Sequence, residues 1–272
     1  MGSSVCMDKK NAVAAALCIA LLIATLAAVG PGGRRRAKES VCRANLRIWG
    51  EITDAHAQDN DGRLWDTMPG TPCYWWVRYM DEPYKDWKTN RFWFCPTATV
   101  PIIDENGNTG YPSRSSIFNA WGIWHTTGVG PNGISGSYAI NGYVLEPSNP
   151  STKYEGGVST SSGWHTPYVQ GADRVPLYVD ALRFDLWPLP TNGPAVDQYG
   201  AWTGNNMARC CINRHDGAVN MAFLDFSARK VGLKELWKLK WHRDFDTDGP
   251  WTPAGGVQPQ DWPQWIREFK DY

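Results

Sequence analysis

The sequence lacks a net charge and lacks the short motifs that mark common catalytic sites. Its 27 Lys and Arg residues are matched by 27 Asp and Glu residues, so no electrostatic argument favours nucleic acid as a partner. There is no phosphate-binding Walker loop, no His-Glu-x-x-His helix, no Gly-x-Ser-x-Gly turn and no Cys-x-x-Cys pair. The five histidines are scattered, and none has a partner at metal-ligand spacing. These absences predict that the protein is not an enzyme; an anchored hydrolase without a recognisable motif is the remaining alternative.

The sequence does contain one apolar stretch, residues 12–29, without a charged side chain. A helix of these 18 residues would be about 27 Å long, which is close to the thickness of a bilayer core. We therefore predict a transmembrane segment within residues 1–33. The residues expected to contact lipid or neighbouring subunits are Ala12, Leu17, Ile19, Leu21, Leu22, Ile23, Leu26 and Val29.

Two features leave the fate and the orientation of this segment open. The small residues at Leu26-Ala27-Ala28 would suit cleavage of a secretory signal, although the apolar stretch is long for one. More Lys and Arg residues follow the segment than precede it, with Arg34, Arg35, Arg36 and Lys38 after it. Taken alone, the positive-inside rule would place the rest of the chain in the cytoplasm.

Residues 34–62 are expected to form an amphipathic helix. Cys42, Leu46, Trp49 and Ile52 recur at spacings of three and four, which places them on one face, where we expect them to pack against a sheet. The helix should end near Asp59-Asn-Asp-Gly62, a cluster of residues that favour turns.

Residues 63–272 are predicted to form a head with long Gly-, Pro- and Trp-rich loops, since the chain contains 27 Gly, 19 Pro and 16 Trp. Residues 175–181 have the pattern of a buried strand, and residues 219–231 have that of a β-hairpin. The expected fold class is α+β, with the long N-terminal helix packed on an antiparallel sheet.

Cysteines and carboxylates provide the remaining candidate sites. If the head lies outside the cytoplasm, the disulfide candidates are Cys73, Cys95, Cys210 and Cys211, with the pairing left open. Asp244, Asp246 and Asp248 alternate before Gly249, as in the first half of a calcium-binding loop. The glutamate that completes such a loop is missing, so a solvated acidic turn is the alternative to a calcium site.

Four stretches of the sequence, taken in order, carry a resemblance to a known family. They are Arg34-Arg-Arg-Ala-Lys-Glu-Ser-Val-Cys-Arg-Ala-Asn-Leu-Arg47 with Ala57-Gln-Asp-Asn-Asp-Gly62, then Phe94-Cys-Pro-Thr97, Ser137-Tyr-Ala-Ile-Asn-Gly142, and Arg214-His-Asp-Gly-Ala-Val-Asn-Met-Ala-Phe-Leu-Asp225 continuing through Leu236-Trp-Lys-Leu-Lys-Trp-His242. The chain resembles the prepilin-like, pseudopilin-type proteins of planctomycetes and related bacteria. The C-terminal region of these proteins carries a histidine, then nine residues, then Asp-Gly. Here the histidine is His215, Asp216 and Gly217 are the first two of the nine residues, and Asp225 stands at the position of the aspartate.

The resemblance implies a pilin-like fold, anchored in the inner membrane by its N-terminal helix, with the head in the periplasm or outside the cell. It also implies a structural subunit that assembles with other pilin-like subunits in a type II secretion or type IV pilus-like system. The alternative function is a membrane-anchored extracellular binding module, with exposed tryptophans stacking on glycans.

The sequence departs from this family at two positions. Prepilins carry Gly followed by Phe-Thr-Leu-Ile-Glu at their processing site, whereas Asn-Ala-Val-Ala-Ala follows Lys10 here. The Asp-Gly pair is replaced by Asp225-Phe226, and a bulky residue is disfavoured where a turn requires positive φ. We therefore expect the turn after Asp225 to take another form.

Overall fold

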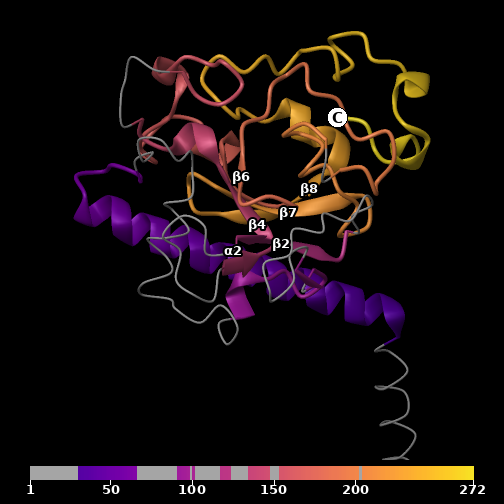
Figure 1. Cartoon of the computed structure of the whole chain (residues 1–272), viewed down its shortest axis with the longest axis horizontal. Helices are drawn as coiled ribbons and strands as arrows, with labels where there is room; N and C mark the ends of the chain where they lie inside the picture. The colour runs from indigo at the N-terminus through magenta and orange to yellow at the C-terminus, as the bar shows by residue number, and fades with distance from the viewer. Residues whose placement is uncertain are drawn as a thin grey trace, which may run out of the picture. The chain divides into compact units, whose positions relative to one another are not determined.

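The computed structural model describes residues 30–65, 91–98, 100–101, 117–123, 134–147, 153–201 and 204–272. The chain divides into two compact units, Met1–Lys38 and Glu39–Tyr272. The described ranges contain one α-helix, α2 (Pro31–Asp59), which crosses the boundary between the units. From Glu39 onward the helix belongs to the larger unit, where it lies against a β-sheet (Figure 1).

The ends of α2 follow from local backbone chemistry. Pro31 is the first helical residue, a position where its missing amide hydrogen would have had no partner within the helix. After Asp59 the chain turns through Asp61 and Gly62, whose φ angles are 55° and 77°. The amide of Gly62 donates to the carbonyl of Ala57 at 2.7 Å, which closes the end of the helix. The helix thus ends at the predicted cluster of turn-forming residues.

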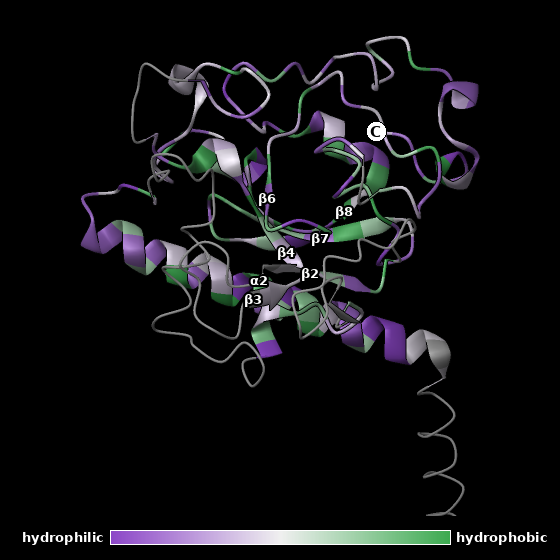
Figure 2. Ribbon diagram, in the orientation of Figure 1, coloured by the Kyte–Doolittle hydropathy of each residue, from purple (hydrophilic) through white to green (hydrophobic). Residues whose placement is uncertain are grey.

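The helix α2 is too polar to cross a membrane. Arg34, Arg35, Arg36 and Lys38 are exposed, and hydrophilic residues continue along the helix (Figure 2). Across the ranges that the structure describes, no helix combines the length and the apolar character that a bilayer crossing requires. This finding contradicts the predicted single-pass inner-membrane protein with an external head. The predicted membrane residues lie outside the described residues; they are Ala12, Leu17, Ile19, Leu21, Leu22, Ile23, Leu26 and Val29.

Two β-sheets form the body of the larger unit. The five-stranded sheet has the order β6-β4-β5-β7-β8, and all its pairs are antiparallel except β4 with β6. Its strands are β4 (Tyr138–Asn141), β5 (Pro176–Asp180), β6 (Asp185–Leu186), β7 (Ala218–Phe223) and β8 (Ala228–Gly232). The three-stranded sheet has the order β1-β2-β3, with β1 (Val100–Pro101), β2 (Asn119–Ile123) and β3 (Ile134–Gly136).

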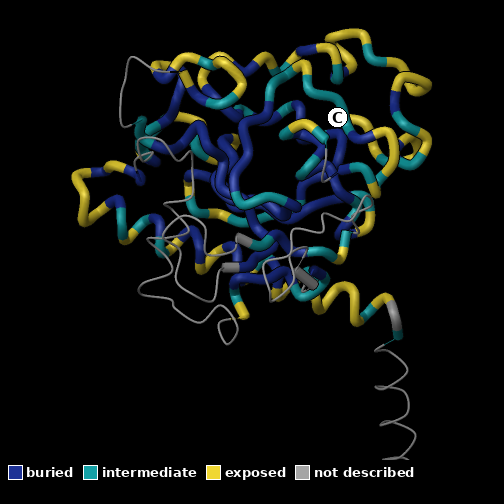
Figure 3. The backbone as a smooth tube through the Cα atoms, in the orientation of Figure 1, coloured by how far each residue is buried: buried dark blue, intermediate teal, exposed yellow. Residues whose placement is uncertain are grey.

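Short 3₁₀ turns lie before, between and after these strands. They are η1 (Arg91–Trp93), η2 (Gly142–Val144), η3 (Thr160–Ser162), η4 (Ala172–Arg174), η5 (Leu233–Lys238), η6 (Pro259–Asp261) and η7 (Gln264–Ile266). The segment after β8 lies on the opposite side of the large sheet from α2 (Figure 1). Every residue of β5 and β7 is consequently buried, and the buried core runs through the sheet (Figure 3).

The buried stripe of α2 packs on the face of the sheet that carries Tyr178. Cys42, Leu46 and Trp49 are fully buried, and Ile52 is partly buried against the core. The hydroxyl groups of Thr53 and Tyr178 are hydrogen-bonded at 3.1 Å. The four residues predicted to dock this helix therefore lie on its inner face, as their spacing indicated.

The predicted fold class needs correction. The expected long apolar N-terminal helix is not found in the described ranges, whose single helix is charged and whose remaining elements are mostly strands. The sheets are also not purely antiparallel, because β1 pairs with β2, and β4 with β6, in parallel. The described structure is a mostly β fold with one amphipathic helix, instead of the expected pilin-like α+β fold.

The hairpin between β7 and β8 contains the Asp225-Phe226 turn. Phe226 has a φ of 63°, so it adopts the left-handed conformation. We had expected its bulky side chain to prevent that conformation. Its side chain packs against the core, and its backbone lies so close to Gly50 of α2 that a Cβ there would contact it at 3.4 Å. Packing of the Phe226 ring offsets the strain of its backbone. The local sequence does not show this packing.

The tryptophans fill the interior. Within the described ranges none is exposed: Trp251 and Trp265 are partly buried, and all the others are buried. Trp187 packs directly on Gly142, where a Cβ would lie 2.3 Å from the indole ring. Stacking on a sugar requires an exposed aromatic face, so these tryptophans give the glycan-binding alternative no support.

His242 is expected to make folding stability depend on pH. It is 5% exposed, packs between the rings of Tyr143 and Phe245, and neither ring nitrogen has a hydrogen-bond partner among the described residues. Burial lowers its pKa from 6.5 to about 4, with Lys240 acting in the same direction and Asp244 opposing it. The unfolded chain therefore binds this proton more readily, and stability falls as the pH decreases from about 6.5 to about 4.

Thermal melting measured from pH 7 to pH 4 tests this expectation. The variant His242→Gln, which cannot be protonated, should lose several degrees less in Tm over that interval than the unaltered chain. Equal losses in both proteins would show that His242 does not contribute to the pH dependence.

Candidate metal centre

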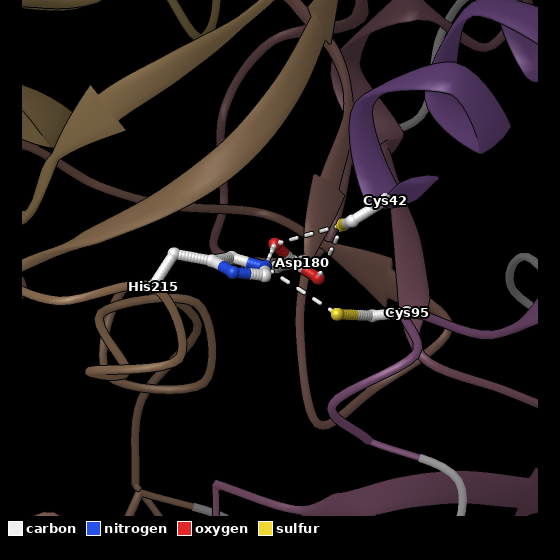
Figure 4. A group of neighbouring side chains, drawn as sticks. All are labelled: Cys42, Cys95, Asp180 and His215. Carbon is white, nitrogen blue, oxygen red and sulfur yellow. Dashed lines mark hydrogen bonds and ion pairs between the residues drawn. The ribbon is translucent and has the colours of Figure 1, made fainter. Parts of the chain in front are cut away.

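Four buried side chains from four separate segments converge on one point inside the larger unit. They are Cys42 of α2, Cys95 after η1, Asp180 at the end of β5 and His215 before β7 (Figure 4). One potential ligand atom from each lies within 4.8 Å of those of the others. Among the residues that the structure describes, this is the one group of His, Cys, Asp or Glu side chains that could hold a metal ion.

Asp180 is the hub of the cluster. Its Oδ1 accepts a hydrogen bond from Arg214 at 3.1 Å, and its Oδ2 accepts from the backbone amide of Asn220 at 2.8 Å. The Nε2 atom of His215 lies 3.0 Å from the same Oδ2. Both carboxylate oxygens are 3.6 Å from the Sγ atom of Cys42. One strand-end carboxylate thereby contacts the helix, the neighbouring strand and the histidine loop.

Cys95 is positioned by a tight backbone turn. The amide of Ala98 donates to its carbonyl at 2.8 Å, and its own amide donates to the hydroxyl of Ser137. Its Sγ atom lies 3.3 Å from Nε2 of His215. The thiol is thus held beside the imidazole by bonds to its own backbone.

The loop before β7 directs His215 into the cluster. Asp216 and Gly217 both adopt left-handed conformations, with φ angles of 58° and 74°. The amide of His215 donates to the carbonyl of Ala218 at 3.0 Å, and the amide of Gly217 donates to Oδ1 of Asn213 at 2.7 Å. Glycine suits the second of these positions because it adopts positive φ without strain.

Arg214 brings a buried positive charge to the site. Its side chain is fully buried and forms an ion pair with Asp180. The remaining guanidinium hydrogen bonds go to backbone carbonyls, those of Ile117, Asn119, Ser137 and Ala181, at 2.9 to 3.4 Å. Arg214 therefore joins the segment that contains β2 to the ends of β4 and β5.

The cluster shifts the pKa values of its members in opposite directions. Burial opposes ionisation of Asp180, but His215, Arg214 and the Asn220 amide outweigh it and lower its pKa to about 2. Burial also disfavours a charged His215, yet Asp180 and Cys95 raise its pKa to about 9. Burial and the neighbouring Cys95 and Asp180 raise the pKa of Cys42. Burial alone would also raise the pKa of Cys95, but hydrogen bonds with Cys42 and His215 and the charge of Arg214 lower it. The cluster thus favours a thiolate at Cys95 beside a charged imidazole.

The donor set suits a soft divalent metal ion. Two sulfurs, one imidazole nitrogen and one carboxylate oxygen match the ligand types that zinc takes in tetrahedral protein sites. The side chains are sealed from solvent: Cys42, Cys95 and Asp180 are 0% exposed and His215 is 5% exposed. A substrate would have no access to such a centre, so the arrangement fits a structural site better than a catalytic one.

The structure gives several predicted residues a different role from the one expected. Cys42, predicted only to pack against the sheet, contributes a thiol to the cluster, and His215 of the family motif contributes its imidazole. Asp216 and Gly217 form the loop that positions His215, whereas Asp225 lies in the β7–β8 turn, where it accepts hydrogen bonds from Ser227. The motif therefore divides between the cluster and a distant turn.

The sequence did not reveal Asp180 or the role of Arg214. Asp180 does leave one signal, because it is a charged residue at the end of the apolar run from Val175 to Val179. An aspartate that is buried in a strand normally has a polar partner, and that partner here is Arg214.

The disulfide candidates in the described ranges are not paired. Cys95, Cys210 and Cys211 are buried free thiols, and Cys73 lies outside the described residues. Disulfide formation requires a partner sulfur at bonding distance, and the sulfur near Cys95 is that of Cys42, which was not among the predicted candidates.

The predicted calcium ligands are not gathered into one site. Asp244 accepts a hydrogen bond from the hydroxyl of Ser162, and Asp248 pairs with Lys238 at 2.8 Å. Asp246 accepts from the backbone amide of Asp248 at 2.9 Å. The three carboxylates thus serve separate local contacts, which is the arrangement of a solvated acidic turn.

Comparison with known proteins provides no relative from which a role could be transferred. No protein-family model, no curated protein and no solved structure matches the chain.

Proposed function

We propose that the chain is a structural subunit of the pseudopilin type, which assembles with copies of itself or with similar subunits in a type II secretion or type IV pilus-like system. In this proposal it catalyses no reaction. Its buried polar groups hold the fold together, and its outer surfaces make the contacts of the assembly.

One observation carries the proposal: the stretches that resemble pseudopilin-type proteins meet at the buried cluster. Cys42 comes from the first stretch, Cys95 from the second, Ser137 from the third and His215 from the fourth. Ser137 contacts the cluster through its hydroxyl, which accepts from the Cys95 amide, and through its carbonyl, which accepts from Arg214. Segments that are far apart in the sequence therefore share one structural task, which favours a role in building the subunit.

The outer face of α2 offers a surface for a second copy. Val41 and Ile48 are among the few large apolar residues that are exposed, at 50% and 38%. Ala44 and Ala55 are exposed on the same helix. Val41, Ile48 and Ala55 are seven residues apart and so lie on one face, which is the spacing of residues that meet between packed helices.

Site-specific photo-crosslinking in cells tests the assembly. A photoreactive amino acid in place of Ile48 should give a ladder of crosslinked chains, and the additional change Val41→Glu should reduce that ladder several-fold. The same probe in place of Gln260, which is exposed in η6, serves as the matched control and should crosslink far less. Chains that remain monomeric with the probe at position 48 would contradict the proposed assembly.

The Val41→Glu variant must fold normally for this comparison to be valid. Because Val41 is half-exposed, its replacement should leave the Tm of the purified chain within a few degrees of the original value. A loss of crosslinking together with an unchanged Tm would then report on the contact between copies.

A further inference from the structure

We propose that Cys42, Cys95, Asp180 and His215 bind one Zn²⁺ ion, which fastens α2 to the sheet from the inside. This inference concerns the interior of a single chain. It does not depend on the assembly proposed above and stands or falls separately from it.

The distances within the cluster approach those between the ligands of a tetrahedral zinc site. With bonds of about 2.3 Å to sulfur and about 2.0–2.2 Å to nitrogen and oxygen, neighbouring ligand atoms lie about 3.3–3.8 Å apart. The Cys42 Sγ atom is 3.6 Å from Asp180, and the Cys95 Sγ atom is 3.3 Å from His215 Nε2. The third contact, from His215 Nε2 to Asp180 Oδ2, is 3.0 Å. The remaining pairs of ligand atoms lie within 4.8 Å, so shifts of up to about 1 Å would bring the four atoms to the corners of a tetrahedron.

The charges around the cluster balance with a divalent ion. Two thiolates and one carboxylate carry three negative charges, and Zn²⁺ with the guanidinium of Arg214 carries three positive charges. This balance matters because Arg214 and Asp180 are fully buried, where a net charge would be strongly unfavourable. A neutral His215 would complete the ligand set without changing the balance.

A second layer of hydrogen bonds holds the ligands in place. Arg214 and the Asn220 amide fix the two oxygens of Asp180, and the hydroxyl of Ser137 fixes the backbone of Cys95. Tyr138 donates from its hydroxyl to the Sγ atom of Cys42 at 3.4 Å. Metal ligands in proteins are typically oriented by such outer contacts.

A disulfide between Cys42 and Cys95 is the competing chemistry. It would use the two sulfurs alone and leave out the donor atoms of His215 and Asp180, whose side chains point at the same place (Figure 4). The convergence of four different donors on one point favours the metal ion over the disulfide.

The first experiment measures metal in the full-length chain after expression in zinc-supplemented medium. We expect about one zinc ion per chain by elemental analysis. Removal with a chelator should lower the Tm by about 10 °C, because an ion present far above its Kd stabilises only the folded chain. One equivalent of Zn²⁺ should restore the Tm, whereas Ca²⁺ and Mg²⁺ should not, since they prefer oxygen ligands.

Ligand variants locate the ion. The Cys95→Ala chain should contain no zinc, whereas the Cys211→Ala chain, which loses another fully buried free thiol, should keep it. Should Cys95→Ala fail to fold, Co²⁺ added to the chelated wild-type chain gives an independent measurement. Absorption from sulfur-to-cobalt charge transfer is expected, since two thiolates bind the ion.

Three results would overturn the proposal. The first is a wild-type chain that carries no zinc and whose Tm does not respond to chelation or to added Zn²⁺. The second is zinc that persists in a folded Cys95→Ala chain. The third is an intact mass and fragment pattern that show Cys42 and Cys95 joined as a disulfide in the purified protein.

Discussion

Replacing Arg214 with methionine is expected to destabilise the folded chain by about 3–5 kcal/mol, enough to unfold a large share of the molecules at 37 °C. The variant removes the fully buried guanidinium that pairs with Asp180 and leaves His215 and the Asn220 amide as the remaining partners of that buried carboxylate. It also removes the guanidinium hydrogen bonds to backbone carbonyls, which are those of Ile117, Asn119, Ser137 and Ala181.

The change in unfolding free energy can be measured by urea denaturation, with Arg63→Met as the control. Arg63 pairs with Glu146 at 3.6 Å, but its side chain is 71% exposed, so water replaces the lost contact. We expect its loss to change stability by no more than about 0.5 kcal/mol. Similar effects for the two variants would contradict the role given to Arg214.

A double variant separates the ion pair from the rest of the site. In Arg214→Met combined with Asp180→Asn, the carboxylate that lost its arginine partner is gone as well, so the total loss should be smaller than the sum of the two single losses. A strictly additive result would mean that the two side chains act independently despite their 3.1 Å contact.

Replacing Trp49 with alanine is expected to destabilise the chain by about 3–5 kcal/mol, since it leaves a cavity between α2 and the sheet. The Trp49 ring lies 4.7 Å from that of Trp93 and 5.7 Å from that of Tyr178. Its Nε1 atom also donates to the carbonyl of Phe92 at 3.1 Å, and that bond is lost with the ring.

The neighbouring residue Ile48 provides the control for this variant. It lies on the same helix but is 38% exposed, so Ile48→Ala should cost less than about 1 kcal/mol. Urea denaturation of both variants gives the comparison. If Trp49→Ala were tolerated as well as Ile48→Ala, the helix would not depend on its inner face for docking.

Local patterns in the sequence were sufficient to locate the packing helix and the central strands. The spacing of Cys42, Leu46 and Trp49 places them on one face of any helix, and that face is buried. The alternation in residues 219–223 likewise predicts a strand that pairs in a hairpin, as β7 does with β8. Such periodicities depend only on the geometry of the backbone, which is the same in every fold.

The membrane prediction shows the limit of such patterns. Hydropathy identified residues 12–29, which lie outside the described residues, and the helix that the structure does describe is charged. The turn at Phe226 shows a second limit: local propensity argues against a left-handed phenylalanine, and packing against α2 overrides it.

The sequence by itself determined the inner face of α2, the β7–β8 hairpin and the buried run that ends at Asp180, because each depends on residues only a few positions apart. The tertiary structure alone decided that Cys42, Cys95, Asp180 and His215 meet, since dozens of residues separate each from the next and no spacing rule extends across such distances. Their meeting required the pairing of β5 with β7 and the docking of α2, which are set by the burial of apolar surface over the whole unit.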